Sequence, residues 1–318
     1  MFGNITDVPG VKVGHKEDNN ALTGCTVIST EEGATAGVDV RGSAPGTRET
    51  DLLDPVNTVN EVHAICLAGG SAFGLEAASG VMQYLEEQGV GLDVGVAKVP
   101  IVPSAILFDL AVGNPNVRPN KEMGYEAAKS AKRGMFKMGN VGAGCGATVG
   151  KLLGFENAMK SGLGSASVKV DELIVGAIVA VNAVGDVRDP NTNEILAGTR
   201  HPETRQLVNS EKFLREKHQL FTQKGTNTTI GVVAVNAKLT KAEAKKIAQV
   251  TQNALARTIA PVHTTMDGDT IFTLGTGDKV YPIDIIASLA IKVMEEAIIR
   301  AVKEADSTHD IDAWKDLK

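Results

Sequence analysis

Aromatic residues are scarce in this chain of 318 residues: they make up 4% of it, and there is a single tryptophan. The hydrophobic core must therefore be built mainly from aliphatic side chains. Enough of them are present, because hydrophobic residues reach 43% and charged residues 22%, which is ordinary for a globular protein. The length suits one large α/β domain, so we expect a single domain over residues 1–318.

Cysteines are few as well. Cys25, Cys66 and Cys145 form an odd, scattered set, which is not the pattern of a disulfide framework. No histidine stands at a spacing that would pair with Cys145 as a nucleophile, so we expect a small buried hydrophobe there. The six histidines show neither HExxH nor HxxxH spacing, and we predict no metal and no cofactor.

Three further features are missing. The net charge is −6 with acidic and basic residues interspersed, and no Lys/Arg block offers a basic face to nucleic acid or an anionic membrane. No apolar run has the length of a membrane span. The opening residues lack the pattern of a signal peptide, so we expect a cytoplasmic protein.

The periodicity of the apolar residues indicates strands alternating with helices, a pattern typical of sheets covered by helical layers. Strands are expected at Cys25–Ser29, Ala34–Arg41, His63–Leu67, Ile174–Val181, Thr229–Val235 and Asp269–Leu274. Helices are expected after a cap at Ser71, after a capping box of Thr240 and Glu243, and from a cap at Asp284 to about Ala305. Residues 185–224 are polar and aperiodic, and we interpret them as a long surface excursion.

At Asn227–Thr228 the polar segment meets a buried strand. If that bond is cut, Thr228 becomes an N-terminal residue whose hydroxyl is a nucleophile and whose α-amine, with a reference pKa of about 7.7–8.0, is a base. No Ser-His-Asp triad would then be required. Threonine is also common at the start of strands, and this segment alone favours that ordinary interpretation.

Two acidic residues, Asp267 and Asp269, flank a glycine at the start of a predicted strand. Side chains two apart on a strand share a face, so both carboxylates can point to one site and orient an amine or exchange a proton. An Asp-Gly-Asp turn explains the same residues.

A third polar position, Asn182, ends an apolar strand in AVNAVG and needs a partner. Its amide could bind a developing oxyanion or simply cap a turn. The glycine-rich segment 139–151 is not a P-loop, because Gly146 and Gly150 are separated by three residues and Leu152 follows Lys151. Lys151 is either a solvated lysine or a buried cation that keeps a neighbouring amine neutral.

Taken together, these segments resemble the self-processing family of the L-aminopeptidase/D-esterase DmpA, the β-peptidyl aminopeptidases and the nylon-oligomer (6-aminohexanoate) hydrolase. The resemblance covers nearly the whole chain. The matching segments are ITDVPGVKVGH, AGVDVRGSAPGTRE, AICLAGGSAFGLEAASGV, VPSAILFD, GNVGAGCGATVGK, AVNAVGDV, GTNTTIGVV and HTTMDGDTIF.

The resemblance implies a four-layer α/β/β/α sandwich and self-cleavage into an α chain, residues 1–227, and a β chain, residues 228–318. It also implies a homo-oligomer, commonly a tetramer of αβ units. Carried over residue by residue, it implies Thr228 as nucleophile, Asn182 as oxyanion binder, Lys151 as the family's lysine, and Asp267 and Asp269 as the acidic pair.

Two positions depart from the aminopeptidases of the family. The first acidic position is a serine there, so Asp267 places this chain nearer the nylon-hydrolase branch. A family tyrosine matches Phe108, which has no hydroxyl. Apolar Val102, Ile106 and Phe108 are expected to line the pocket if that segment borders the site.

The expected activity is hydrolysis of small peptides, amides or esters by an N-terminal threonine aminopeptidase. The alternatives are a 6-aminohexanoate oligomer hydrolase, an acyltransferase of the ornithine-acetyltransferase type, and a binding module that kept the fold without the chemistry.

Overall fold

The computed structural model describes residues 1–217 and 227–317. Nine strands in these residues are connected by hydrogen bonds in the order β10-β11-β14-β16-β2-β4-β7-β3, with β1 paired to β2. Their bounds are β1 Lys12–Asp18, β2 Thr23–Val40, β3 Thr47–Arg48, β4 Glu61–Ala68, β7 Ser104–Ile106, β10 Leu163–Val170, β11 Leu173–Asn182, β14 Thr228–Val235 and β16 Thr270–Gly275.

Short strand pairs and five α-helices complete the described elements. The short strands are β5 Leu92–Asp93 with β6 Lys98–Val99, β8 Thr148–Val149 with β9 Met159–Lys160, and β12 Asp186–Arg188 between β13 Ile195–Ala197 and β15 Ile259–Ala260. The helices are α1 Ala77–Glu87, α2 Lys121–Lys129, α3 Ser210–Lys217, α4 Lys241–Thr258 and α5 Ile283–Lys303.

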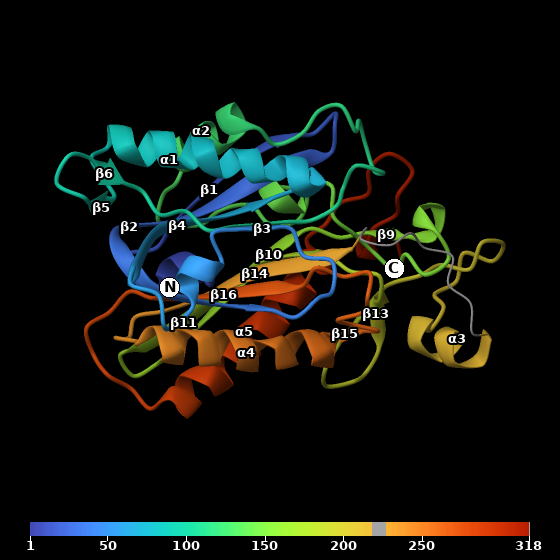
Figure 1. The fold of residues 1–318 in the computed structure, drawn as a ribbon. Coiled ribbons are helices and arrows are strands. Elements are labelled where there is room, and N and C mark those ends of the chain that lie inside the picture. The colour runs from blue at the N-terminus through green and yellow to red at the C-terminus, as the bar shows by residue number, and fades with distance from the viewer. Residues whose placement is uncertain (218–226, 318) are drawn as a thin grey trace.

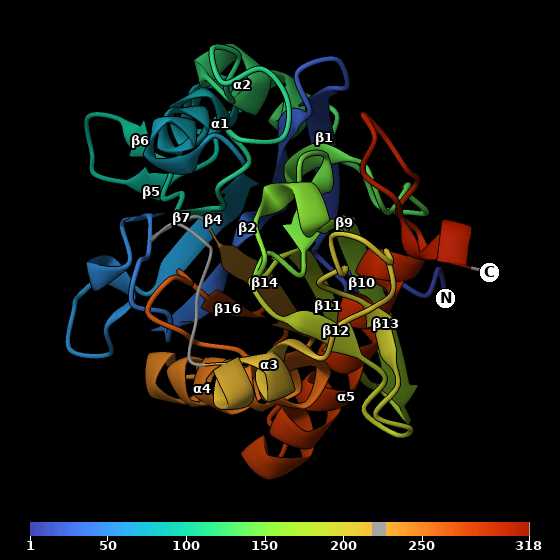
Figure 2. The same cartoon turned by 90° about the vertical axis from the view of Figure 1, so that its right-hand side faces the viewer.

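The strands form two layers between two layers of helices, as Figures 1 and 2 show from perpendicular directions. The layering follows from the alternation of side chains along each strand. On β14, Val233 and Val235 pack toward α4 and α5, whereas Ile230 and Val232 pack between the strand layers. On β4, Ile65 belongs to that central cluster, while neighbouring residues pack under α1 and α2. Three apolar clusters therefore separate four layers, and the expected α/β/β/α sandwich is confirmed.

Strand β2 belongs to both strand layers. Its first half pairs with β1 and β4, and its second half pairs antiparallel with β16. The pairing with β4 shifts register between Ser29 and Ala34, an irregularity of the kind that lets a strand bend. The two strands expected at Cys25–Ser29 and Ala34–Arg41 are thus one strand, in which Gly33, with a positive φ of 85°, lies at the irregularity without reversing the chain.

Helix starts were predicted with mixed success. The capping box is present: the Thr240 hydroxyl accepts from the backbone N–H of Glu243, whose carboxylate accepts from the N–H of Thr240. Ser71 is not a helix cap, because it begins a 3-10 turn with a positive φ of 54°, and α1 follows six residues later. Asp284 is also not the cap; Pro282 precedes α5 and Asp284 lies in its first turn.

The segment predicted as a surface excursion is more ordered than expected. Residues 186–217 hold β12, β13 and α3, and several side chains are buried, including Asp186, Ala197 and Ser210. Asp186 organises them: its carboxylate accepts from the backbone N–H groups of Thr199 and Ser210 at 3.0 and 2.8 Å. These hydrogen bonds to a buried carboxylate do not require periodic apolar residues, so the sequence pattern did not indicate the order of this segment. Residues 218–224 of that prediction lie outside the described residues.

Candidate active site

Thr228 and Asn182 stand opposite one another on neighbouring antiparallel strands. They are Cα partners at the start of β14 and the end of β11. Opposed residues of an antiparallel pair point to the same face, which here is the face between the two strand layers. Both residues are buried, with exposed fractions of 2% and 0%. The sheet register therefore brings together the two residues that the sequence predicted as nucleophile and oxyanion binder.

The Asn182 amide is held in one orientation. Its Oδ1 accepts from Lys151 Nζ at 2.6 Å and from the backbone N–H of Thr148 at 3.1 Å. Its Nδ2 donates to the carbonyl oxygen of Phe108 at 2.9 Å. An amide nitrogen carries two protons, so one N–H of Asn182 is left for a ligand. Asn182 is not a turn cap but a fixed donor.

The Asn227–Thr228 peptide bond has hydrogen-bond donors on its carbonyl oxygen. The Asn227 carbonyl oxygen accepts from the backbone N–H of Gly268 at 3.0 Å and also from the Thr228 hydroxyl. Asn227 pairs in parallel with Asp267, which extends the β14–β16 ladder one step beyond the bond. The oxygen of this amide thus has a backbone donor, and the Thr228 hydroxyl lies beside it.

The two carboxylates lie next to this bond and are both buried. Burial and then the charge of Asp269 raise the pKa of Asp267 to about 6, against hydrogen bonds from Thr264 that lower it. Asp269 Oδ1 accepts from the backbone N–H of Thr229 at 2.7 Å, so it holds the backbone at the residue after Thr228. The turn in this segment precedes the pair, because the Asp267 N–H donates to the Thr264 carbonyl, and Asp267-Gly268-Asp269 is not itself a turn. That both carboxylates serve one site stays a prediction.

Lys151 is completely buried rather than solvated. Burial lowers its pKa to about 7, while the charges of Asp267 and Asp109 act in the opposite direction. A group whose charge changes near neutral pH beside a carboxylate with a pKa near 6 marks a site able to move protons. A second buried lysine, Lys160, supports the glycine-rich segment by donating to the carbonyl of Ala147 at 3.0 Å.

The predicted pocket residues divide between the site and the core. The Phe108 carbonyl binds Asn182, and its ring stands 6.2 Å from the ring of Phe155. Lys151 Nζ lies 5.7 Å from the centre of the Phe155 ring. Ile106 and Val102 pack instead in the cluster beneath α1 and α2. Their part in a substrate pocket stays a prediction.

Several residues at the site were missed from the sequence: Thr148, Phe155, His263, Thr264 and Gly268. Most contribute backbone groups or stand in loops, where residue type carries little signal. The exception is His263, whose ring Nδ1 lies 2.8 Å from Asp269 Oδ2. A polar His-Thr-Thr run directly before the acidic pair was a signal available in the sequence.

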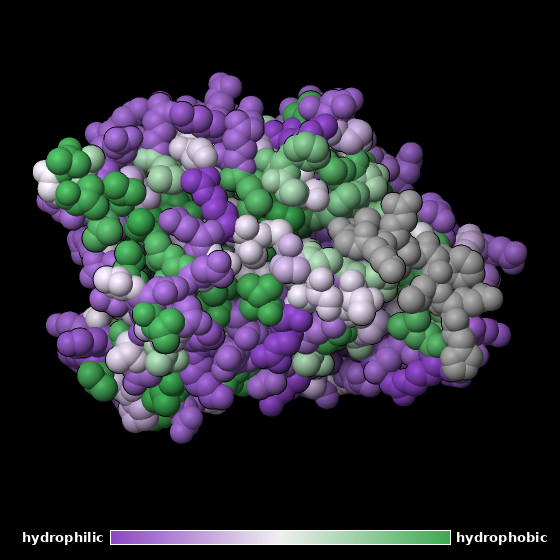
Figure 3. Space-filling model, in the orientation of Figure 1, coloured by the Kyte–Doolittle hydropathy of each residue, from purple (hydrophilic) through white to green (hydrophobic). Residues whose placement is uncertain are grey.

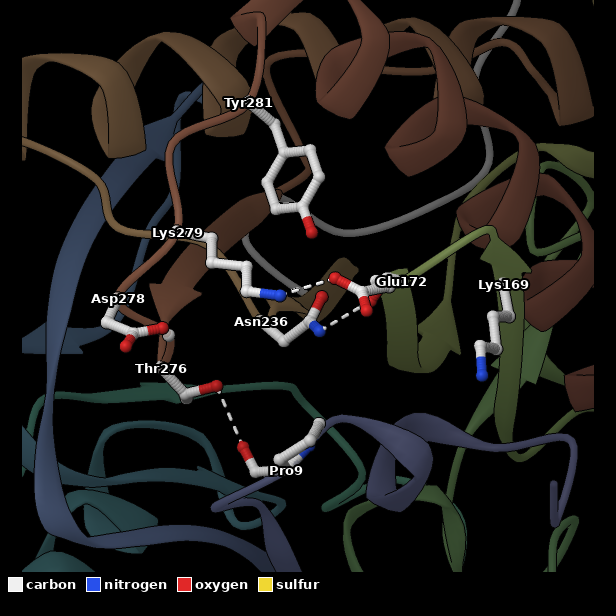
Figure 4. A pocket seen from close by; sticks show the side chains of 9 residues that line it. Pro9, Lys169, Glu172, Asn236, Thr276, Asp278, Lys279 and Tyr281 are labelled. Atoms are coloured by element: carbon white, nitrogen blue, oxygen red, sulfur yellow. Dashed lines mark hydrogen bonds and ion pairs between the residues drawn. The ribbon is translucent and has the colours of Figure 1, made fainter.

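A hollow of about 580 Å³ lies at the other ends of β14 and β16, away from Thr228 (Figure 4). Its polar groups are engaged with one another: Lys279 pairs with Glu172, Asn236 donates to the Glu172 carbonyl, and the Thr276 hydroxyl donates to Pro9. None of the site residues described above lines it. The candidate site residues thus lie away from this hollow, at the Thr228 end of β14.

Comparison with known proteins agrees with this geometry. The family model of peptidase family S58 matches residues 3–314. An uncharacterized aminopeptidase of Mycobacterium leprae is 43% identical over 87% of this chain and 79% of its own length. A 6-aminohexanoate-oligomer endohydrolase of a Kocuria species is 32% identical over 93% of this chain and 85% of its own length.

The chain belongs to peptidase family S58. It is a hydrolase that acts on peptide or amide bonds. Two solved structures share its fold: the L-aminopeptidase D-Ala-esterase/amidase of Ochrobactrum anthropi, with a TM-score of 0.71 at 17% identity over 96% of this chain and 86% of that one, and a Burkholderia β-aminopeptidase, with a TM-score of 0.70 at 20% identity over 98% and 90%. No helix in residues 1–217 and 227–317 is long and apolar enough to cross a membrane.

Proposed function

We propose that this hydrolase cuts its own chain between Asn227 and Thr228 and then uses Thr228 as an N-terminal nucleophile on small peptides, amides or esters. The observation that carries the proposal is the pair of donors on the Asn227 carbonyl, the Gly268 N–H and the Thr228 hydroxyl. They lie on the one peptide bond whose cleavage would free the amine of a threonine opposite Asn182.

Self-cleavage begins when Thr228 Oγ1 attacks the Asn227 carbonyl carbon. The hydroxyl proton passes to the amide nitrogen, the C–N bond breaks, and an ester joins Asn227 to Thr228 Oγ1. Water then hydrolyses the ester, which releases an Asn227 carboxylate and restores the hydroxyl next to a new α-amine. The carboxylate pair beside the bond is placed to carry the proton, since Asp267 exchanges it near pH 6.

Turnover repeats the same chemistry on a separate amide. The Thr228 amine takes the hydroxyl proton and passes it to the leaving amine, and the acyl group leaves Thr228 with water. The spare N–H of Asn182 is oriented for the oxyanion, and Lys151 holds that amide in place. Above pH 7 Lys151 is mostly neutral, so it adds little positive charge beside the amine.

The site is closed in the uncut chain. Asn227, Thr228, Asn182 and Lys151 are all 2% exposed or less. A substrate needs the place that Asn227 occupies on the Gly268 N–H. Self-cleavage therefore serves two purposes in this proposal, because it creates the amine and frees the acyl position.

A second candidate activity is hydrolysis of ω-amino-acid oligomers. It is favoured by the 6-aminohexanoate-oligomer endohydrolases, which are 31–32% identical over 93% of this chain, and by an acid rather than a serine at Asp267. Acyl transfer to an amine is a further outcome of the same acyl-enzyme. Added amines would divert product from free acid to a new amide, which mass spectrometry distinguishes.

We also propose association into a homo-oligomer of αβ units. The β5–β6 hairpin is the strongest surface support, because Val94 and Val96 are exposed at its turn. Figure 3 shows apolar side chains gathered at that end of the molecule. Sedimentation of the purified protein measures the state directly.

The deciding experiment is the intact mass of the purified protein under denaturing conditions, beside that of Thr228→Ala. Two species of roughly 24 and 9–10 kDa are expected, from 227 and 91 of the 318 residues. Thr228→Ala should stay whole and inactive. A processed Thr228→Ala chain, or a wild type that stays whole and inactive after long incubation, contradicts the proposal.

A further inference from the structure

His263 binds the acidic pair but has no role in the mechanism proposed above. Its backbone N–H and its ring Nδ1 both reach Asp269 Oδ2, at 3.2 and 2.8 Å. The residue adopts a positive φ of 53°, a region that histidine enters several times more often than most residues other than glycine. In this conformation the backbone N–H and the ring of His263 both face the same carboxylate oxygen.

The two carboxylates are not equally supplied with donors. Asp269 accepts from the backbone N–H groups of Thr229 and His263 and faces the imidazole, so both of its oxygens are occupied. Asp267 receives the backbone N–H and the hydroxyl of Thr264, both on Oδ2. Its Oδ1 is buried and has no hydrogen-bond partner among the described residues.

Two buried carboxylates that repel one another do not both ionise readily, and hydrogen bonds to the charged form decide which one does. The ring of His263 faces Asp269; Asp267 interacts with Asp269, and Lys151 interacts with Asp267. Donors converge on both oxygens of Asp269, whereas Oδ1 of Asp267 has none, and hydrogen bonds favour the charged form of the carboxylate that accepts them.

We propose that His263 is a positioning residue that, through an Nδ1–H bond to Asp269, keeps that carboxylate charged and thereby assigns proton exchange to Asp267. Only the catalytic consequence of this inference rests on the proposed function. The ring tautomer and its link to the pair are properties of the folded chain. His263 touches neither substrate nor nucleophile.

The tautomer is measured by NMR of protein labelled with 15N-histidine, the His263 signals being identified by their loss in His263→Asn. Nδ1 should be protonated in the wild type and in Asp267→Asn. In Asp269→Asn, where the carboxylate acceptor is missing, Nδ1 should lose this preference for the proton. The wild-type signals should also shift with an inflection near pH 6 that disappears in Asp267→Asn. A ring protonated only on Nε2, or signals indifferent to both substitutions, overturns the proposal.

The catalytic consequence is measured by the pH dependence of kcat/KM on the aminoacyl p-nitroanilide that the wild type hydrolyses fastest. With the imidazole donor lost and only the backbone donors left on Asp269, the pair holds its proton more tightly. His263→Leu should therefore move the acid limb upward by about half to one pH unit. His263→Asn keeps a side-chain N–H and suits a positive φ, so it should move the limb by less than half as much. Identical limbs in all three proteins overturn the proposal.

Thermal unfolding of each variant serves as the control for correct folding. If His263→Leu does not fold, His263→Asn and the NMR experiment still decide. A wild type that remains whole and inactive contradicts the N-terminal threonine mechanism, whereas the NMR result for His263 is unaffected. The two proposals therefore fail separately.

Discussion

The backbone N–H of Gly268 donates to the carbonyl oxygen of Asn227 at 3.0 Å, and the Cα of Gly268 is also close to the nucleophile. A Cβ on Gly268 would stand 2.8 Å from Thr228 Oγ1 and 2.6 Å from the Ala44 carbonyl. Gly268 is thus both a donor and a spacer at the bond.

Gly268→Ala should slow self-cleavage, because the added methyl group pushes the strand and the hydroxyl out of line. Loss of one oxyanion donor costs about 10²–10³ in rate in other hydrolases, and we expect a loss within that range. Time-resolved intact mass of freshly expressed protein measures it. Gly89→Ala is a control away from the bond, since nothing lies within 4 Å of its added Cβ. Equal cleavage rates in the two variants would remove Gly268 from the mechanism.

Asn182→Ala should remain folded but lose about 10²–10³ in kcat, because the spare N–H is lost with the amide. Asn182→Asp is the sharper variant. It keeps the acceptor for Lys151 Nζ but has no N–H for an oxyanion, so it should be as slow as alanine. Steady-state kinetics on an amide substrate measures both. Activity near wild type in Asn182→Asp would show that another donor binds the oxyanion.

Asp267→Asn should remove the acid limb of the pH profile. The pKa of Asp267 is raised to about 6, so the carboxylate form that accepts a proton is lost as the pH falls through 6. The wild-type rate should therefore rise through that pH, and the variant should be slow and flat. Asp186→Asn is the control, since burial raises its pKa to about 6 as well, in a structural cluster bound to Ser210 and Thr199. If Asp267→Asn keeps the acid limb of the wild type, a group other than Asp267 causes that limb.

Phe108→Tyr restores the hydroxyl of the aminopeptidases at that position. We expect self-cleavage to be unchanged, because Phe108 binds Asn182 through its backbone carbonyl. Substrate preference should shift instead, by roughly 10-fold or less, as one polar group changes in an apolar wall. Comparison of kcat/KM on α-aminoacyl and 6-aminohexanoyl amides measures the shift. Impaired self-cleavage in Phe108→Tyr would show that the ring also shapes the nucleophile's surroundings.

Stability should increase with pH between about 7 and 8.5. Burial lowers the pKa of Lys151 to about 7 and that of Lys160 to about 8, so in this range the unfolded chain holds protons that the folded chain has lost. Each lysine contributes a slope of at most about 1.4 kcal/mol per pH unit. Urea unfolding of Thr228→Ala measures the slope, and adding Lys160→Met should reduce it. A slope that is flat in both proteins would mean that the lysines stay charged when folded.

The fold could be predicted where sequence periodicity is strong. The strands ending at Asn182 and starting at Thr228 are continuous apolar runs, and a buried strand of that kind leaves little freedom in register. The Thr240–Glu243 capping box is a local signal and was equally readable. Ser71 and Asp284 have the right chemistry for caps, but tertiary packing starts both helices elsewhere.

The candidate site was harder to predict, because its precision comes from backbone atoms. The Gly268 N–H, the Thr148 N–H and the Phe108 carbonyl hold or polarise the key groups, and any residue type supplies them. The predicted side chains Thr228, Asn182, Lys151 and the acidic pair do lie together. Their assigned roles stay predictions until the variants are measured.

The strand order β11-β14-β16-β2 interleaves the two sides of the Asn227–Thr228 bond. Strands β14 and β16 come after the bond, and each is paired on its outer side with a strand that comes before it. Once the bond is broken, unfolding also separates two molecules, so its midpoint should depend on protein concentration, unlike that of Thr228→Ala. The cut would leave the folded state nearly unchanged while making every later refolding a search for a partner.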